Sequence, residues 1–431
     1  MKKIQSRQLL LLIFLLPSFL QRIFIGAEIS SYSEITGLSL SWLGYASHFA
    51  IILIAISDKT IFKNKIFLKY ILPVTVLSLL HLLLLTQFND DAWNAGSLGI
   101  ARFLIWITAC AAISYYITAE EFLNMLIKLV DISFVIIVIS TIIYHISGIP
   151  FQIIFSGGTP RAQAFFTEPS TVAAFLAGYI ALSIFNRDKK RIIVSVLVMF
   201  FVNSVLALLG LLVGFALGTA SKRFMKKQYY RKLILILFIL LMLLLFIIAA
   251  FSSDISNYAK SISNSLEGSS FADSSFYHIF VNRILQAAIE FENGVELIRN
   301  NENIAGGGLF RYTSMISLIE QMNNSWRAFT GYGLGAHAQV MLSQGKNILD
   351  FGFLPLLLSS FGYLIGATVL YWIAKQITKY HSQLSIFIIP FALLAMFNSA
   401  GGIHTYSVLL VSVFLFAKKN NNKTPKFKRD I

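Results

Sequence analysis

The sequence predicts an all-α polytopic integral membrane protein, with about 12 transmembrane helices and one large, partly helical extracytoplasmic loop. Of its 431 residues, 56% are hydrophobic and only 13% are charged, whereas soluble chains carry about 25% charge. Several apolar runs approach the roughly 20 residues that a spanning helix needs. The single cysteine, Cys110, cannot form an internal disulfide, which excludes a secreted disulfide scaffold, and the high hydrophobicity excludes a disordered chain.

Apolar runs with few charges give the expected spans. In chain order they are 9–27, 38–57, 69–88, 97–118, 123–147, 169–186, 192–204, 206–220, 232–251, 349–374, 383–398 and 402–417. The first run follows Met-Lys-Lys and could belong to a signal peptide. Because Ile25 precedes Gly26 and Ala27, the cleavage site would be poor, and we interpret this run as a span.

Two apolar stretches are divided into pairs of helices because basic residues flank each stretch at both ends. A single crossing by 192–220 would leave strong positive charge on both faces of the membrane. Two short helices hinged near Asn203 and Ser204 keep both basic clusters on one side. The same reasoning divides 383–417 at the turn-like segment 399–402.

The distribution of basic residues predicts the orientation. With the N-terminus inside, the inner segments contain 25 of the 35 basic residues, so both termini are expected in the cytoplasm. The net charge of +15 then reflects basic residues that mark the cytoplasmic side and lie beside anionic lipids. No segment interleaves basic and aromatic residues as a nucleic-acid binder would. When Lys128 and Asp131 are also assigned inward, nine bases and fourteen acids remain outside, so individual arginines would have to attract an anionic substrate there.

The order of spans divides the chain into four regions: helices 1–9 in 1–251, an outer loop in 252–348, the last three helices in 349–417 and a basic cytoplasmic tail in 418–431. In the outer loop, apolar residues recur at helical spacing from 276 to 298 and from 309 to 322. We therefore expect helices that cap the outer ends of the spans.

Charged residues within the apolar runs are costly and are candidates for function. Lys128 and Asp131 lie three residues apart near the inner end of the fifth span, which predicts a neutralising pair on one helix face. Arg22 and Arg102 lie near outer ends of spans. Each could extend to the membrane interface or face an outward-open cavity that attracts an anion.

The segment 157–171 leads into the sixth span from the outside and contains the first group of candidate site residues. Pro169 is expected in the first helical turn and disfavours helical geometry at Glu168. Glu168 could therefore cap the helix or act as a base. Arg161 precedes it by seven residues, and a guanidinium group matches phosphate oxygens. Together these two residues could handle a diphosphate.

A second group of candidates lies in the outer loop. It consists of Arg311, Arg327, His337, Lys346 and Asn347. The alternating glycines before His337 are not a dinucleotide fingerprint, because no βαβ unit surrounds them. His337 could be a general base or a hydrogen-bonded loop histidine. No zinc spacing or Walker loop is present, so the sequence predicts neither a metal nor a cofactor.

The chain resembles the O-antigen polymerase and ligase superfamily, which are bacterial integral-membrane glycosyltransferases. The resemblance covers the whole predicted topology and is most specific from Arg161 to Glu168-Pro169-Ser170. It extends to Arg311 followed by the Gly-Tyr-Gly-Leu-Gly motif at 331–335. The segment 347–353, with Gly362 and Gly366, resembles the family's stretch that re-enters the membrane. Many relatives have a histidine before Asn347, where this chain has Lys346.

The resemblance implies a GT-C-like fold and a metal-independent glycosyl transfer on the outer side of the bacterial cytoplasmic (inner) membrane. The substrate would be an undecaprenyl-diphosphate-linked oligosaccharide, polymerised into O-antigen or a similar surface polysaccharide. A flippase and a chain-length regulator would be partners. Arg161 and Arg311 would stabilise the leaving diphosphate, and Glu168, or else His337, would be the base. Arg102, Arg327, Lys346 and Asn347 would bind substrate.

Two alternatives remain open. An O-antigen ligase would transfer finished glycan to another acceptor, although Lys346 and the Glu168-Pro169 pair favour a polymerase. A lipid-linked oligosaccharide flippase or another secondary transporter also fits about 12 spans. The absence of similarity between the two halves of the chain argues against a transporter, as does the long outer loop.

Overall fold

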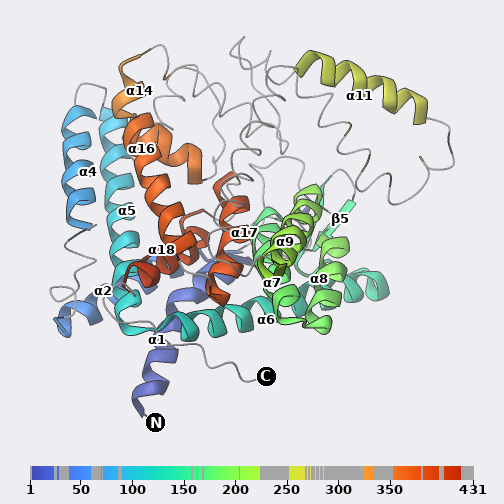
Figure 1. Ribbon diagram of the computed structural model, residues 1–431, viewed down its shortest axis with the longest axis horizontal. Coiled ribbons are helices and arrows are strands. Elements are labelled where there is room, and N and C mark those ends of the chain that lie inside the picture. Colours follow the sequence, from blue (N-terminus) through green and yellow to red (C-terminus); the bar gives the residue numbers. More distant parts are fainter. Residues whose placement is uncertain are drawn as a thin grey trace.

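The computed structural model shows how the apolar runs fold (Figure 1). It describes residues 2–23, 27–28, 38–59, 69, 71–85, 90–156, 159–162, 164–166, 169–202, 204–223, 252–266, 269, 272, 277, 281, 285, 322, 325–333, 353–379, 382–397 and 402–418. The helices are α1 (Lys2–Phe19), α2 (Ser41–Ser57), α4 (Leu72–Leu85), α5 (Asp90–Tyr116), α6 (Ala119–Ser147), α7 (Pro169–Asn186), α8 (Lys189–Val202), α9 (Val205–Arg223), α11 (Ser252–Leu266), α14 (Arg327–Thr330), α16 (Phe353–Lys379), α17 (Gln383–Phe397) and α18 (Gly402–Lys418). The strands are β1 (Arg22–Ile23), β2 (Ala27–Glu28), β3 (Leu38–Ser39), β4 (Ile153–Ser156) and β5 (Thr159–Ala162).

The described part of the chain is mostly helical and strongly apolar, as expected of a helical membrane protein. Among the described residues, four helical stretches are long and apolar enough to cross a membrane: Ser97–Tyr116, Ala119–Ser147, Leu206–Arg223 and Leu357–Lys379. Shorter apolar helices lie within α1, α2, α7, α17 and α18. The full set of about 12 spans stays a prediction. The expected span at 232–251 lies outside the described residues.

Both predicted divisions into helix pairs are confirmed. Helix α8 ends at Val202 and α9 begins at Val205, on either side of the predicted hinge. Helix α17 ends at Phe397 and α18 begins at Gly402. The helix breaks are thus present, whereas the placement of the basic clusters on one side of a membrane stays a prediction.

Helix α1 is shorter than the predicted span 9–27. It ends at Phe19, and short strands β1 and β2 follow. The backbone N–H groups of Gln21 and Arg22 both donate to the carbonyl of Phe165, at 3.0 Å each. These backbone N–H groups thus form tertiary hydrogen bonds in place of helical ones. An apolar run in the sequence does not by itself reveal such a partner.

The region 252–348, which is predicted to form the outer loop, contains a helix that the sequence analysis missed. Helix α11 is rich in serine, and its Ala259 is buried against Tyr277 and Leu285. Most of the helices expected at 276–298 and 309–322 lie outside the described residues.

Helix α7 occupies the centre of the protein, and every residue from Thr171 to Ser183 is buried. Helix α9 packs against it through glycines spaced four residues apart. A Cβ atom at Gly210 would lie 2.5 Å from the carbonyl oxygen of Ala173, and one at Gly214 would lie 2.5 Å from that of Ala177. These glycines therefore let two backbones approach closely, as in membrane helix pairs with small residues at the interface.

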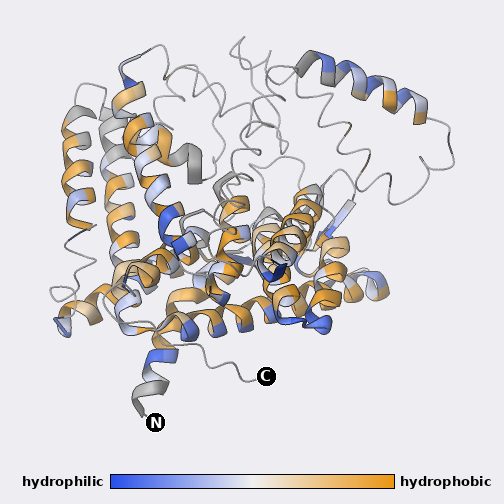
Figure 2. Cartoon of the chain, in the orientation of Figure 1, coloured by the Kyte–Doolittle hydropathy of each residue, from blue (hydrophilic) through white to orange (hydrophobic). Residues whose placement is uncertain are grey.

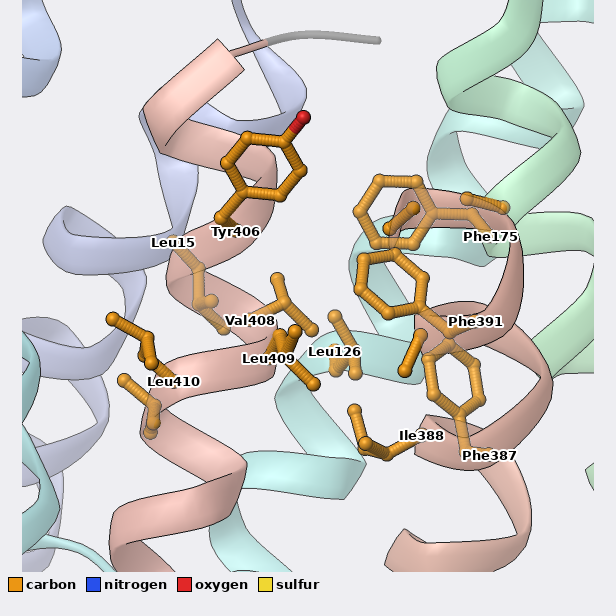
Figure 3. Close-up of a cluster of buried hydrophobic side chains, with 14 of the residues drawn as sticks. Leu15, Leu126, Phe175, Phe387, Ile388, Phe391, Tyr406, Val408, Leu409 and Leu410 are labelled. Atoms are coloured by element: carbon orange, nitrogen blue, oxygen red, sulfur yellow. The ribbon is translucent and has the colours of Figure 1, made fainter. Parts of the chain in front are cut away.

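A column of aromatic rings connects α7 to the rest of the core. The ring centroid of Phe175 lies 5.0 Å from that of Phe391 on α17 and 4.7 Å from that of Phe19 at the end of α1. Figure 3 shows Phe175 beside Phe391, within a buried cluster to which α1, α6, α7, α17 and α18 contribute side chains. Ring packing of this kind stabilises the core beyond simple area burial.

Hydrophilic residues gather along α11 and at the lower rim of the other helices, including the start of α1 (Figure 2). Contacts join helix ends that the sequence placed inside. The Tyr116 hydroxyl donates to Asp58 at 3.0 Å, and Lys418 Nζ donates to the carbonyl of Tyr115 at 2.8 Å. Thus the ends of α2, α5 and α18 lie together, as the predicted topology requires.

Asp131 is not paired as the sequence predicted. The structure pairs it with Arg191 on α8 at 3.0 Å, and the Tyr179 hydroxyl of α7 also donates to its carboxylate. Lys128, the predicted partner, is exposed. A three-residue spacing brings two side chains to one helix face, but here a guanidinium group on a neighbouring helix reaches the carboxylate instead.

We expect Asp131→Asn to destabilise the protein by about 1 kcal/mol, because Arg191 loses its carboxylate partner at a site that water partly screens. Lys128→Ala should leave stability unchanged in detergent. Thermal unfolding of the purified variants checks both expectations. An equal loss of stability in the two variants would instead support the predicted pairing of Lys128 with Asp131.

Candidate functional site

The candidate segment before α7 forms a small strand layer. Strands β4 and β5 pair antiparallel, which places Arg161 opposite Ile154, and β2 pairs parallel to β4. Two buried residues that flank the pair, Gln152 and Ala164, have positive φ angles of 53° and 51°. Positive φ angles are uncommon for residues other than glycine, and strained backbone conformations of this kind are concentrated at functional sites.

Tertiary contacts connect the segment after β5 to the end of α1 and to α7. The carbonyl of Phe165 accepts hydrogen bonds from the backbone N–H groups of Gln21 and Arg22. The ring of Phe166 stacks on that of Phe175, with 5.5 Å between the ring centroids. Arg22 itself lies on β1, which pairs with β3 in a separate two-stranded sheet, and its hydrogen bond to Phe165 connects it to the segment that follows Arg161. Helix α7 begins at Pro169, as predicted. Glu168 lies outside the described residues.

The second site lies where α14 meets α16. Helix α16 is interrupted at Gly362, which has φ 76° and ψ 172°. Because the helix is broken there, the carbonyl groups before the break lack N–H donors from the next helical turn. The N–H of Tyr332 donates to the carbonyl of Ser359 at 2.7 Å, and that of Gly333 donates to Ser360 at 3.0 Å. The loop thus satisfies backbone groups that would otherwise be left unpaired in a low-dielectric region.

Two glycines allow this close approach. A Cβ atom at Gly331 would lie 2.5 Å from the backbone nitrogen of Phe361. One at Gly362 would overlap the carbonyl of Phe329 and lie 2.8 Å from the nitrogen of Thr330. Gly331 of the loop's glycine motif and Gly362, which interrupts α16, are therefore two halves of one junction. Sequence reasoning named both motifs separately but did not foresee that they meet.

Arg327 is held inside this junction and is only 6% exposed. Its guanidinium group lies 4.0 Å from the ring centroid of Trp326 and 5.6 Å from that of Tyr332, and Nη1 donates to the carbonyl of Gly331 at 3.4 Å. Burial lowers the pKa of Arg327, while the nearby Tyr332 opposes this shift. Burial also raises the pKa of Tyr332. These contacts position the loop around Arg327.

Arg102 is exposed on α5, with its guanidinium 5.8 Å from the ring centroid of Tyr45 on α2. The next residue, Phe103, contacts Phe361 at 6.3 Å between ring centroids. Arg102 is therefore one residue from the contact between α5 and the broken part of α16.

The described residues form two groups rather than one site. Arg161 lies on β5, and Arg22 lies on β1 in a separate two-stranded sheet, from which its backbone N–H reaches Phe165. Arg102 and Arg327 lie near α16, and Figure 1 shows β5 and α14 well apart. Four further candidates lie outside the described residues, namely Arg311, His337, Lys346 and Asn347. Within the described part of the chain, no three His, Cys, Asp or Glu side chains are arranged to hold a metal ion.

No family model, curated protein or solved structure matches this chain.

Proposed function

We propose that the protein is a membrane glycosyltransferase that polymerises polyprenyl-diphosphate-linked oligosaccharide repeat units on the outer side of a bacterial cytoplasmic membrane. The observation that carries the proposal is the position of Arg161, on a strand fixed against the ends of α1 and α7. This segment also contains the pattern from Arg161 to Ser170 that resembles polymerases. A guanidinium group on a fixed backbone is suited to bind phosphate oxygens in a defined geometry.

In the proposed reaction, a hydroxyl oxygen of the acceptor sugar attacks the anomeric carbon of the donor glycan. The bond between that carbon and the diphosphate oxygen breaks, and its electron pair leaves with the lipid diphosphate. Arg161 and Arg311 stabilise the charge that develops on this leaving group. Glu168 takes the hydroxyl proton, with His337 as the alternative base.

The remaining candidates bind substrate in this proposal. Arg102 is exposed and available to an anion. Lys346 and Asn347 lie outside the described residues, and their binding role rests on the resemblance. The internal contacts of Arg327 fit a positioning role in the loop better than direct binding. The product is an O-antigen or a similar surface polysaccharide. A flippase supplies its lipid-linked precursor, and a chain-length regulator acts on the same pathway.

We expect Arg161→Ala to lower polymer formation by about 100-fold or more, because the leaving diphosphate loses a placed cation. Cells that lack the protein are complemented with the variant, and the length of their surface polysaccharide is measured on gels. Lys260→Ala is the matched control, since it removes a positive charge from exposed α11 on the same predicted side. Normal long-chain polymer at wild-type protein level would contradict the proposal.

The deletion strain separates the alternatives. Loss of a polymerase leaves single repeat units attached to their final acceptor, whereas loss of a ligase leaves none. Loss of a flippase instead leaves lipid-linked repeats on the inner side of the membrane. Only the first outcome supports a polymerase.

A further inference from the structure

A polar cavity of about 310 Å³ lies on the side of the protein that the sequence places in the cytoplasm. It is lined by residues from the N-terminal halves of three helices that are far apart in the chain. Gln8 comes from α1, Glu121, Asn124 and Lys128 come from α6, and Arg191 comes from α8. Met125 and Ile127 add an apolar part to the lining. The cavity thus combines two cations, one carboxylate and two amides with a hydrophobic wall.

Most charges around this cavity are already balanced by neighbours. Arg191 pairs with Asp131 at 3.0 Å and with Asp188 at 3.6 Å. Glu121 accepts the backbone N–H of Thr118 at 2.8 Å in a capping box, where the helix N-terminus favours a negative charge. Lys128 is exposed and forms no ion pair within the described part of the chain. It is therefore the cation of the cavity that remains available to a ligand.

The amide side chains near Lys128 supply further hydrogen-bond donors. Asn124 precedes Lys128 by one helical turn, so both side chains lie on the same face of α6. Gln8 faces them from α1, and both amides are exposed. One ammonium group with two amide donors suits a singly charged phosphodiester. The apolar lining from Met125 and Ile127 suits the glycerol and acyl portion beside such a phosphate.

We propose that this cavity binds the phosphate of an anionic phospholipid headgroup from the inner leaflet, with Lys128, Asn124 and Gln8 as the binding side chains. Basic pockets between helices on the cytoplasmic side are suited to such headgroups. The ligand is a headgroup rather than free phosphate because the cavity lies among helix ends that the sequence places at the membrane surface. This site is on the opposite side from the proposed glycosyl transfer and does not depend on it.

Native mass spectrometry of the full chain tests the proposal, with phosphatidylglycerol or phosphatidylcholine added to the detergent. We expect phosphatidylglycerol to be retained in preference, and Lys128→Ala to weaken its binding by about tenfold. Asn124→Ala should also weaken binding, although it changes no charge. Lys190→Ala is the matched control, because Lys190 is exposed on α8 beside Arg191 but does not line the cavity.

Three results would overturn the proposal. The first is equal loss of phosphatidylglycerol from Lys128→Ala and Lys190→Ala, which would indicate attraction by bulk charge. The second is equal retention of the two lipids by the unmodified chain. The third is displacement of phosphatidylglycerol by millimolar inorganic phosphate, which would identify a site for a soluble ion. Because Lys128 and Asn124 are both exposed, the variants are expected to fold, and circular dichroism checks this.

Discussion

Gly214→Ala is expected to destabilise the protein by about 1–3 kcal/mol, because the new methyl group collides with the backbone of α7. The added Cβ atom would lie 2.5 Å from the carbonyl oxygen of Ala177 and would also overlap the side chain of Ile180. In an ordinary helix interior the same change stabilises by roughly 0.5–1 kcal/mol, since alanine loses less backbone entropy than glycine. The tight pairing of α7 and α9 therefore reverses the sign of the effect.

Thermal unfolding of the purified protein in detergent measures this reversal. Ala216→Val is the matched control, because Ala216 is exposed on the same helix and an enlarged side chain there meets no packed neighbour. Its effect should stay within about 0.5 kcal/mol. An increase in stability for Gly214→Ala would show that α7 and α9 do not approach as closely as described.

Gly362→Ala is expected to lower the free energy of unfolding by about 3 kcal/mol and to release the segment 327–333 from α16. A residue other than glycine is strained at φ 76°, by about 1–2 kcal/mol. The methyl group would also push away Phe329, so that the hydrogen bonds of Tyr332 and Gly333 to α16 are lost, at about 0.5–1.5 kcal/mol each. If this junction supports the proposed glycosyl transfer, polymer formation should fall with it.

Limited digestion with trypsin reports on this junction directly. Arg327 is a potential cleavage site that is 6% exposed, so cleavage there should be slow in the unmodified protein and much faster in Gly362→Ala. Gly366→Ala is the matched control. Its Cβ atom would lie 3.0 Å from the Leu358 side chain and would not touch the loop, so Arg327 should stay protected. Unchanged cleavage in Gly362→Ala would contradict the described junction.

Helix boundaries were predicted well wherever charge or proline marked them. Pro169 begins α7 as expected, and the basic clusters around 192–220 correctly required two helices. The end of α1 was missed because hydrogen bonds to Phe165, a residue distant in sequence, end the helix at Phe19. Local patterns predict where a helix can form, whereas a tertiary partner decides where it stops.

The candidate site was predicted only in its parts. Residue type and position were enough to select Arg161 as a cation near the membrane surface, but its pairing with β4 depends on strand geometry. The pairing of Asp131 was wrongly predicted, because its partner Arg191 lies sixty residues away. A further signal was present in the glycines spaced four apart on α9, which could have indicated the close contact with α7.

By itself, the sequence determined that this is a mostly helical, strongly apolar protein, and it predicted which side of a membrane each charged segment would occupy. Those conclusions depend on hydrophobicity and charge, which are properties of each segment alone. Only the tertiary structure decided that 327–333 closes the break in α16 and that Asp131 pairs across three helices. Such contacts depend on the distance between segments that are remote in the chain, and periodicity carries no information about that distance.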